Sequence, residues 1–270
     1  MLILVGTILS IAASVLAYWG FGLFDLSPWY LFLLIAFVVT FFVLYLNIYW
    51  LIVLIGILPY RNKEFVGKVN KWHLLNIRLT ASFCLTLRGL IIKRKGFKML
   101  PKEPSLIIFN HISDYDPWVL YKCLNGRYAM VGKIALRHIP MVRCMASAVG
   151  TLFVTDGDRE ANNQMIDNAV EYITKKNTSV CIAPEGTRNT SGKLMPFKHG
   201  GFNIATRSNC PIVLIGFSNM QKALTKKKHS YVNINVEVFD VITPEEYNGK
   251  SAAEVAQMCE ERYRKYLGEE

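Results

Sequence analysis

The chain has 270 residues, of which the first 60 contain one charged side chain, Asp25, and the rest hold all 31 Lys and Arg. The net positive charge of the second part could suggest nucleic acid as a partner. The apolar first segment and the absence of a recognisable nucleic-acid-binding module argue against it. The six cysteines lie far apart and include no Cys-x-x-Cys spacing, so we expect buried free thiols in a reducing compartment and no structural metal.

Residues 1–24 and 29–58 are two apolar runs, and they predict two helices joined by a turn. At 1.5 Å per residue the helices would be roughly 36 and 45 Å long, against a hydrocarbon core of about 30 Å. We therefore expect residues 1–60 to form a hydrophobic helical hairpin in the membrane, either spanning it or re-entrant in one leaflet. Basic residues follow between 61 and 71, so the positive-inside rule places the remaining domain, residues 61–270, on the cytoplasmic face.

The second domain is expected to begin with an amphipathic helix within residues 64–90. Apolar side chains recur there at intervals of three and four residues, at Trp72, Leu75, Leu79 and Phe83 among others. Two roles are open for this helix, because its apolar stripe could lie on anionic lipid at the membrane interface or could cover a sheet.

Short apolar strands then alternate with helices along the chain. Strands are expected at residues 106–109, 150–155, 180–183, 211–217 and 231–241, and helices at 117–124, 159–175, 200–207 and 252–267. This alternation is typical of an α/β fold in which a largely parallel, twisted sheet is covered by helices. In such folds the loops that leave the carboxyl ends of the strands carry the ligand site.

Two polar motifs occupy loops of that kind: residues 110–117 read Asn-His-Ile-Ser-Asp-Tyr-Asp-Pro, and residues 184–188 read Pro-Glu-Gly-Thr-Arg. Imidazole titrates near neutrality, which makes His111 a candidate general base. A carboxylate that accepts a hydrogen bond from one ring nitrogen would fix the tautomer, and Asp116 is the candidate. Because Asp116 directly precedes Pro117, a helix-capping role for Asp116 is also open.

The second motif supplies a candidate anion site. Arg188 can bind a phosphate through two hydrogen bonds at once. Glu185 is expected either to orient Arg188 or to bond a substrate hydroxyl, and Gly186 allows a close approach of the backbone. A surface ion pair between Glu185 and Arg188 is the alternative that needs no ligand.

Together the two motifs resemble those of the 1-acylglycerol-3-phosphate acyltransferase family, over about Gly89 to Phe217. The resemblance implies transfer of an acyl chain from an acyl-thioester to the free hydroxyl of 1-acylglycerol-3-phosphate, which makes phosphatidic acid for phospholipid biosynthesis. It implies no cofactor beyond acyl-CoA or acyl carrier protein as the acyl donor. It further implies a substrate-binding role for Glu185, Gly186, Thr187 and Arg188, with added positive charge from Lys133.

The chain departs from the family pattern after the predicted strand at 150–155, where Asp156 stands in place of the usual arginine. Arg159 is the candidate replacement if the loop turns back through Gly157. The expected partners are membrane lipid, a lysophospholipid acceptor and acyl-CoA or acyl carrier protein. Acylation of another lysolipid, including a lyso-aminolipid, is an alternative that Asp156 motivates; a non-catalytic lipid-binding membrane protein and a thioesterase are two others.

Overall fold

The computed structural model describes residues 29–57, 71–189, 193–225 and 230–269, together with residues 12, 15, 16 and 19. The chain divides into two compact units, residues 1–59 and residues 60–270. Each unit is therefore described by itself.

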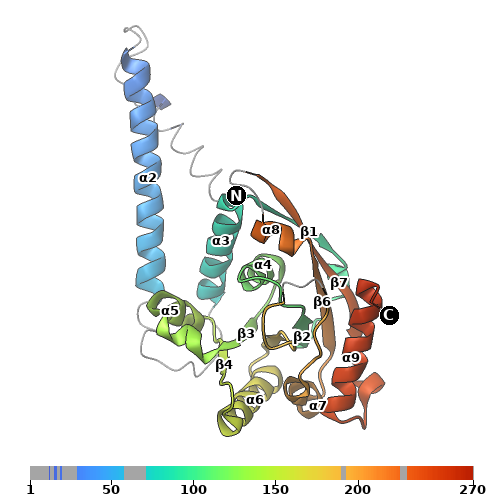
Figure 1. Ribbon diagram of the computed structural model, residues 1–270. Helices are drawn as coiled ribbons and strands as arrows, with labels where there is room; N and C mark the ends of the chain where they lie inside the picture. Colours follow the sequence, from blue (N-terminus) through green and yellow to red (C-terminus); the bar gives the residue numbers. More distant parts are fainter. Residues whose placement is uncertain are drawn as a thin grey trace. The chain divides into compact units, whose positions relative to one another are not determined.

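The first unit contains one long described helix, α2, at Trp29–Ile57 (Figure 1). None of its 29 residues is Asp, Glu, Lys or Arg, and exposed apolar side chains such as Phe37, Val39 and Leu44 line it. Within the described residues, no helix meets the length and hydropathy criteria for a membrane span. The first run of the expected hairpin, residues 1–24, lies almost wholly outside the described residues, so the hairpin itself is not shown.

The second unit is built on a sheet whose described strands follow the order β1-β7-β6-β2-β5-β3-β4 (Figure 1). The strands are β1 Leu90–Lys95, β2 Leu106–Phe109, β3 Tyr128–Lys133, β4 Leu152–Val154, β5 Ser179–Ile182, β6 Ile212–Ser218 and β7 Val232–Ile242. From β6 to β4 all neighbours are parallel, β7 is antiparallel to β6, and β1 is parallel to β7. The expectation of an α/β fold with a largely parallel sheet is confirmed.

Helices cover both faces of this sheet (Figure 1). The α-helices of the second unit are α3 Lys71–Leu87, α4 Asp116–Cys123, α5 Pro140–Ala148, α6 Arg159–Thr174, α7 Asn203–Ser208, α8 Met220–Thr225 and α9 Ala252–Leu267. Short 3-10 turns lie at η3 Phe97–Met99, η4 Ile134–His138, η5 His199–Phe202 and η6 Pro244–Tyr247. The last helix, α9, begins with a capping box in which Ser251 and Glu254 bond each other's backbone, as a capping serine and the glutamate three residues later commonly do.

The main core lies between the sheet and the helices α6, α7 and α9. Alternate residues of two central strands, Leu106 and Ile108 in β2 and Val180 and Ile182 in β5, point into it. The hydroxyl of the fully buried Tyr263 in α9 lies within hydrogen-bond distance of the backbone carbonyls of Ile108 in β2 and Ile215 in β6, and donates its one proton to either. This bond fixes the last helix directly over the central strands.

The helix α3 buries a different stripe from the one that the sequence indicates. Its buried apolar residues are Leu74, Ile77, Ala81 and Leu85, which recur every three to four positions. The expected stripe is wrong as a core-facing surface, because Trp72 is 73% and Leu75 43% exposed. The helix therefore carries two apolar faces, and periodicity alone could not tell which one faces the protein.

Four elements of the second unit were not expected from the sequence: β1, β3, α5 and α8. β1 is an edge strand in which Ile91 and the three basic residues after Ile92 are exposed, so it lacks the alternation of a half-buried strand. β3 ends in Gly132 and Lys133 and is buried only over its first half. β3 nevertheless lies between β5 and β4, and so determines which loops meet at the edge of the sheet.

The six cysteines are all free, as the sequence predicts. Five are buried and Cys84 is half-buried. Burial raises the pKa of Cys123 and of Cys259 to about 12, so these thiols stay protonated and chemically inert in the folded protein.

Candidate active site

The carboxyl ends of three neighbouring parallel strands, β6, β2 and β5, meet at one edge of the sheet. The loop with His111 leaves β2 there, and the turn with Glu185 leaves β5. Backbone bonds join the two segments directly, because Asn189 N donates to His111 O at 2.7 Å. The expectation that the two motifs converge is confirmed.

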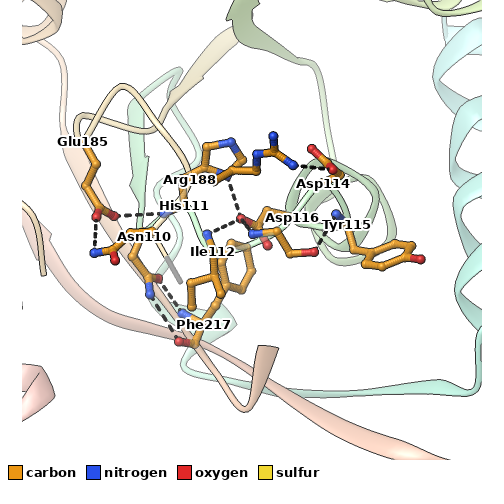
Figure 2. Close-up of polar contacts among 11 residues, drawn as sticks. Asn110, His111, Ile112, Asp114, Tyr115, Asp116, Glu185, Arg188 and Phe217 are labelled. Atoms are coloured by element: carbon orange, nitrogen blue, oxygen red, sulfur yellow. Dashed lines mark hydrogen bonds and ion pairs between the residues drawn. The ribbon is translucent and has the colours of Figure 1, made fainter. Parts of the chain in front are cut away.

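His111 and Asp116 form a hydrogen-bonded pair (Figure 2). The distance from His111 Nδ1 to Asp116 Oδ2 is 2.8 Å, with the imidazole 24% exposed and the carboxylate fully buried. The same Oδ2 accepts hydrogen bonds from Ile112 N at 2.7 Å and from Ser113 N at 2.9 Å. An oxygen that already accepts two N–H bonds acts as an acceptor towards the ring as well, so we assign the ring proton to Nδ1. The other ring nitrogen, Nε2, is left as an acceptor.

Opposing effects act on the pKa of the Asp116 carboxyl group. Burial raises its pKa, while the bonds from His111, Ser113 and Ile112 act in the opposite direction. Its second oxygen, Oδ1, is buried and has no hydrogen-bond partner among the described residues. An acid held in this way is best stabilised by a positive charge that forms on the ring beside it.

Asp116 does not cap the next helix, so that interpretation is wrong. The helix α4 begins at Asp116 itself, and the capping position falls on Tyr115, whose side chain makes no cap bond. The carboxylate instead turns back to the preceding loop, where two backbone N–H groups and the imidazole compete for the same oxygen.

Glu185 holds the two motif segments together from within the protein. It is 3% exposed, and its Oε1 accepts the backbone N–H of His111 at 3.0 Å. Its Oε2 accepts bonds from Asn189 Nδ2 at 3.0 Å and from Met195 N at 3.3 Å. In the part of the chain that the structure describes, Glu185 bonds these three donors and not Arg188. The carboxylate therefore positions the loop that carries the imidazole (Figure 2).

Asn110 fastens the same loop to the third strand. Its Nδ2 donates to Phe217 O at 3.3 Å, and Phe217 N donates to its Oδ1 at 2.8 Å, so the buried amide replaces two backbone ladder bonds. The sequence motif contains Asn110 but indicates no role for it, and nothing in the sequence pattern points to Asn189. The available signal was an amide at the end of a buried strand, where backbone groups of the next strand need partners.

The basic side chains at this edge are exposed and paired. Arg188 Nη1 lies 2.7 Å from Asp114 Oδ2, which brings the arginine of the second motif to the His111 loop. Lys133, at the end of β3, lies 2.8 Å from Asp156, which follows β4. Thr187 is exposed in the turn between Glu185 and Arg188.

Lys198 was not among the expected site residues, yet it lies over the second motif. Gly186 has a φ of +70°, and a Cβ built there would lie 2.7 Å from Lys198 Nζ. Lys198 N also donates to Pro184 O at 2.9 Å. The glycine thus allows a cationic side chain, as well as any ligand, to approach the turn closely.

Arg159 is not brought into this group. It is the first residue of α6 and is exposed, after an Asp158 side chain that caps the helix. Across the described ranges no hydrogen bond or ion pair joins Arg159 to the His111 loop or to the turn at 184–188. The turn at Gly157, with a φ of +81°, leads the chain into the helix rather than back to the site.

A cavity of about 190 Å³ lies at the same edge, lined by Asn110, Ile112, Glu185, Phe217 and Asn219 among others. Its walls combine apolar and amide side chains next to the three strand ends. No group of three or more His, Cys, Asp or Glu in the described parts of the chain is placed to hold a metal ion.

The chain is similar to known proteins over this region. A family model described as Acyltransferase matches residues 75–218, slightly more than half of the chain. The 1-acyl-sn-glycerol-3-phosphate acyltransferase of Saccharomyces cerevisiae is 25% identical over 66% of this chain and 59% of the yeast protein. The protein of that name from Haemophilus influenzae is 25% identical over 78% of this chain and 85% of its own.

The fold has a solved counterpart in the crystal structure of the 1-acyl-sn-glycerophosphate acyltransferase PlsC from Thermotoga maritima. The two superpose with a TM-score of 0.57 over 73% of this chain and 79% of that chain, at 18% identity. The chain spans 56% of the length of a Caenorhabditis elegans relative and 59% of the yeast one.

Replacing Glu185 by glutamine tests its role as the clamp between the two loops. Both oxygens of Glu185 accept hydrogen bonds, whereas the glutamine amide has one oxygen and one NH₂ group. The NH₂ group would face an N–H donor, and at least one buried N–H would be left without an acceptor. We expect the free energy of unfolding to fall by about 1–3 kcal/mol, as measured by urea denaturation. Glu261→Gln, at an exposed position of α9, is the matched control. Equal stability of the two variants would contradict the clamp.

Proposed function

Because the chain belongs to the acyltransferase family, we propose that it transfers an acyl chain from an acyl-thioester to the free hydroxyl of 1-acylglycerol-3-phosphate and so makes phosphatidic acid. The observation that carries this proposal is the hydrogen bond between His111 and Asp116 at the carboxyl end of β2. The relatives' names support the acceptor, and the arrangement of charges supports its phosphate.

The reaction needs a base, and His111 meets that need. The acceptor oxygen attacks the thioester carbonyl carbon, a C–O bond forms, and the hydroxyl proton moves to His111 Nε2. The C–S bond then breaks, and the thiolate leaving group takes the proton from the ring. Asp116, bonded to Nδ1 at 2.8 Å, orients the ring and stabilises the imidazolium while it exists.

Direct attack is favoured over an acyl-enzyme. Ser113 is the nearest hydroxyl in the motif, but it is 1% exposed and its Oγ accepts a hydrogen bond from Tyr115 N at 3.1 Å. A buried, bonded hydroxyl is poorly placed to reach a thioester. The hydroxyl that attacks is therefore that of the acceptor.

The acceptor phosphate is assigned to the basic side chains at the same edge. Arg188, whose side chain is 56% exposed, can exchange its bond to Asp114 for bonds to a phosphate. Lys198 over Gly186 and Lys133 at the end of β3 add charge nearby. For the donor we propose acyl-CoA or acyl carrier protein, whose thioester carries the acyl group without a further cofactor.

Membrane lipid is the proposed source of the acceptor. We assign α2 to the lipid because 29 residues without an acidic or basic side chain, many of them exposed and apolar, are poorly suited to water. The exposed Trp72 and Leu75 on α3, next to Lys71, suit an interface with anionic lipid. The basic second unit would then lie on the cytoplasmic face.

Replacing His111 by alanine tests the base. We expect kcat/KM for acyl transfer to fall by about 10²–10⁴-fold, because general-base assistance is lost while substrate binding stays. The kcat/KM of Asp116→Asn should fall as well, since the neutral amide removes the negative charge that stabilises the imidazolium. His138→Ala, at an exposed turn, is the control. The measurement is a matrix of acyl donors against lysolipid acceptors, with the position of the new ester determined, and transfer by folded His111→Ala at the wild-type rate would refute the mechanism.

Partition between membrane and buffer tests the lipid assignment. Full-length protein mixed with liposomes that contain anionic lipid should stay with the vesicles at high salt, because apolar contacts, unlike ionic ones, are not screened. Release of most of the protein into the supernatant by salt alone would contradict burial of α2. Labelling of a cysteine placed at Ser27, in the turn of the expected hairpin, by an impermeant thiol reagent on the far face of the membrane would separate a spanning arrangement from a re-entrant one.

A further inference from the structure

An ion pair at the outer end of the sheet includes a carboxylate, Asp156, to which the proposed acyl transfer gives no role. Lys133 is the last residue of β3 and Asp156 follows β4, and the carboxyl ends of these two adjacent parallel strands lie on the edge that carries His111. The distance from Lys133 Nζ to Asp156 Oδ2 is 2.8 Å, and the two side chains are 49% and 69% exposed. Both charges are therefore within reach of a headgroup from solvent.

Asp156 is also coupled to the turn of the second motif. Its pKa is lowered first by the hydrogen bond and charge of Lys133 and in smaller part by the charge of Lys198. Lys198 in turn lies against Gly186, next to Glu185. Asp156 is thus an ionised carboxylate that pairs with one cation assigned to the acceptor phosphate, Lys133, and is influenced by the charge of a second, Lys198.

The exposed charges named at this edge leave an excess of one positive charge. Arg188, Lys133 and Lys198 contribute three positive charges, and Asp114 and Asp156 contribute two negative ones. A phosphate monoester carries about −1.5 to −2 at neutral pH. A phosphodiester with an attached amine carries one negative and one positive charge, which the Lys133–Asp156 pair matches group for group.

We propose that Asp156 is a specificity-determining residue that lowers the preference for a phosphate-monoester acceptor and admits lysolipids with a zwitterionic phosphodiester headgroup. This inference rests on the proposed acyl transfer and names the acceptor class of the same site. Asp156 weakens the field of Lys133 on the phosphate and offers a partner to a headgroup ammonium. It touches the acceptor headgroup and not the reacting hydroxyl.

Asp156→Asn tests the inference in the full chain. Exposed ion pairs add little to stability, so the variant is expected to fold. The ratio of kcat/KM for lysophosphatidic acid over lysophosphatidylethanolamine should rise by about fivefold, the effect of one unit charge at about 4 Å in water. The change should appear in KM of the acceptor with kcat nearly constant. Asp167→Asn is the matched control. Asp167 lies on α6, outside the site, is 55% exposed, and pairs with Arg207 of α7 at 2.6 Å.

Equilibrium binding of the same two lysolipids, measured by calorimetry in one detergent, separates the two proposals. If the wild-type protein turns over neither acceptor, the proposed function fails, and the binding ratio still decides the role of Asp156. A ratio that Asp156→Asn leaves unchanged, or that Asp167→Asn raises equally, would overturn the inference.

Arg188→Ala should lower the same ratio, because the variant loses a cation assigned to the phosphate. No loss of monoester preference in that variant would count against the phosphate role of Arg188.

Discussion

The buried carboxylate of Glu185 is the interaction on which the site depends. A charged group in the interior is tolerated only when hydrogen bonds replace the water it loses, and Glu185 has three such bonds, to His111 N, Asn189 Nδ2 and Met195 N. These donors come from the loop after β2 and from the segment after β5, so one side chain sets the distance between them. Asn110 adds the third strand by bonding both backbone groups of Phe217.

The carboxylates at this edge of the sheet are of two kinds, buried and exposed, and the two kinds have different roles. Glu185 and Asp116 are buried, and they fix the position of the loop and the orientation of the imidazole. Asp114 and Asp156 are exposed, and they partner the cations that a headgroup would meet. Removing a partner from a buried carboxylate leaves an uncompensated charge and is costly, whereas an exposed carboxylate gives up its partner to a ligand at little cost. Substitution of an exposed carboxylate can therefore change the acceptor preference without changing the position of the His111 loop.

The sequence predicts the parts that depend on local pattern. Alternating strands and helices gave the largely parallel sheet, and two polar motifs after strands gave the meeting of His111 with the 184–188 turn. The role of Glu185 could not be read in this way, because its partner His111 is 74 positions away and the nearby Arg188 suggested a local pair. The same limit applies to α3, whose two apolar faces have equal periodicity, and to Asp116, whose place before Pro117 suggested a cap.

The central claim is that Asp116 holds the proton of His111 on Nδ1 and leaves Nε2 to accept the proton of the substrate. Nitrogen-15 NMR of the imidazole, recorded at a pH where the ring is neutral, reports directly which nitrogen carries the proton. The structure predicts a protonated Nδ1 and an unprotonated Nε2 in the wild-type protein, with this preference lost in Asp116→Asn. A His111 ring that carries its proton on Nε2 would contradict the account.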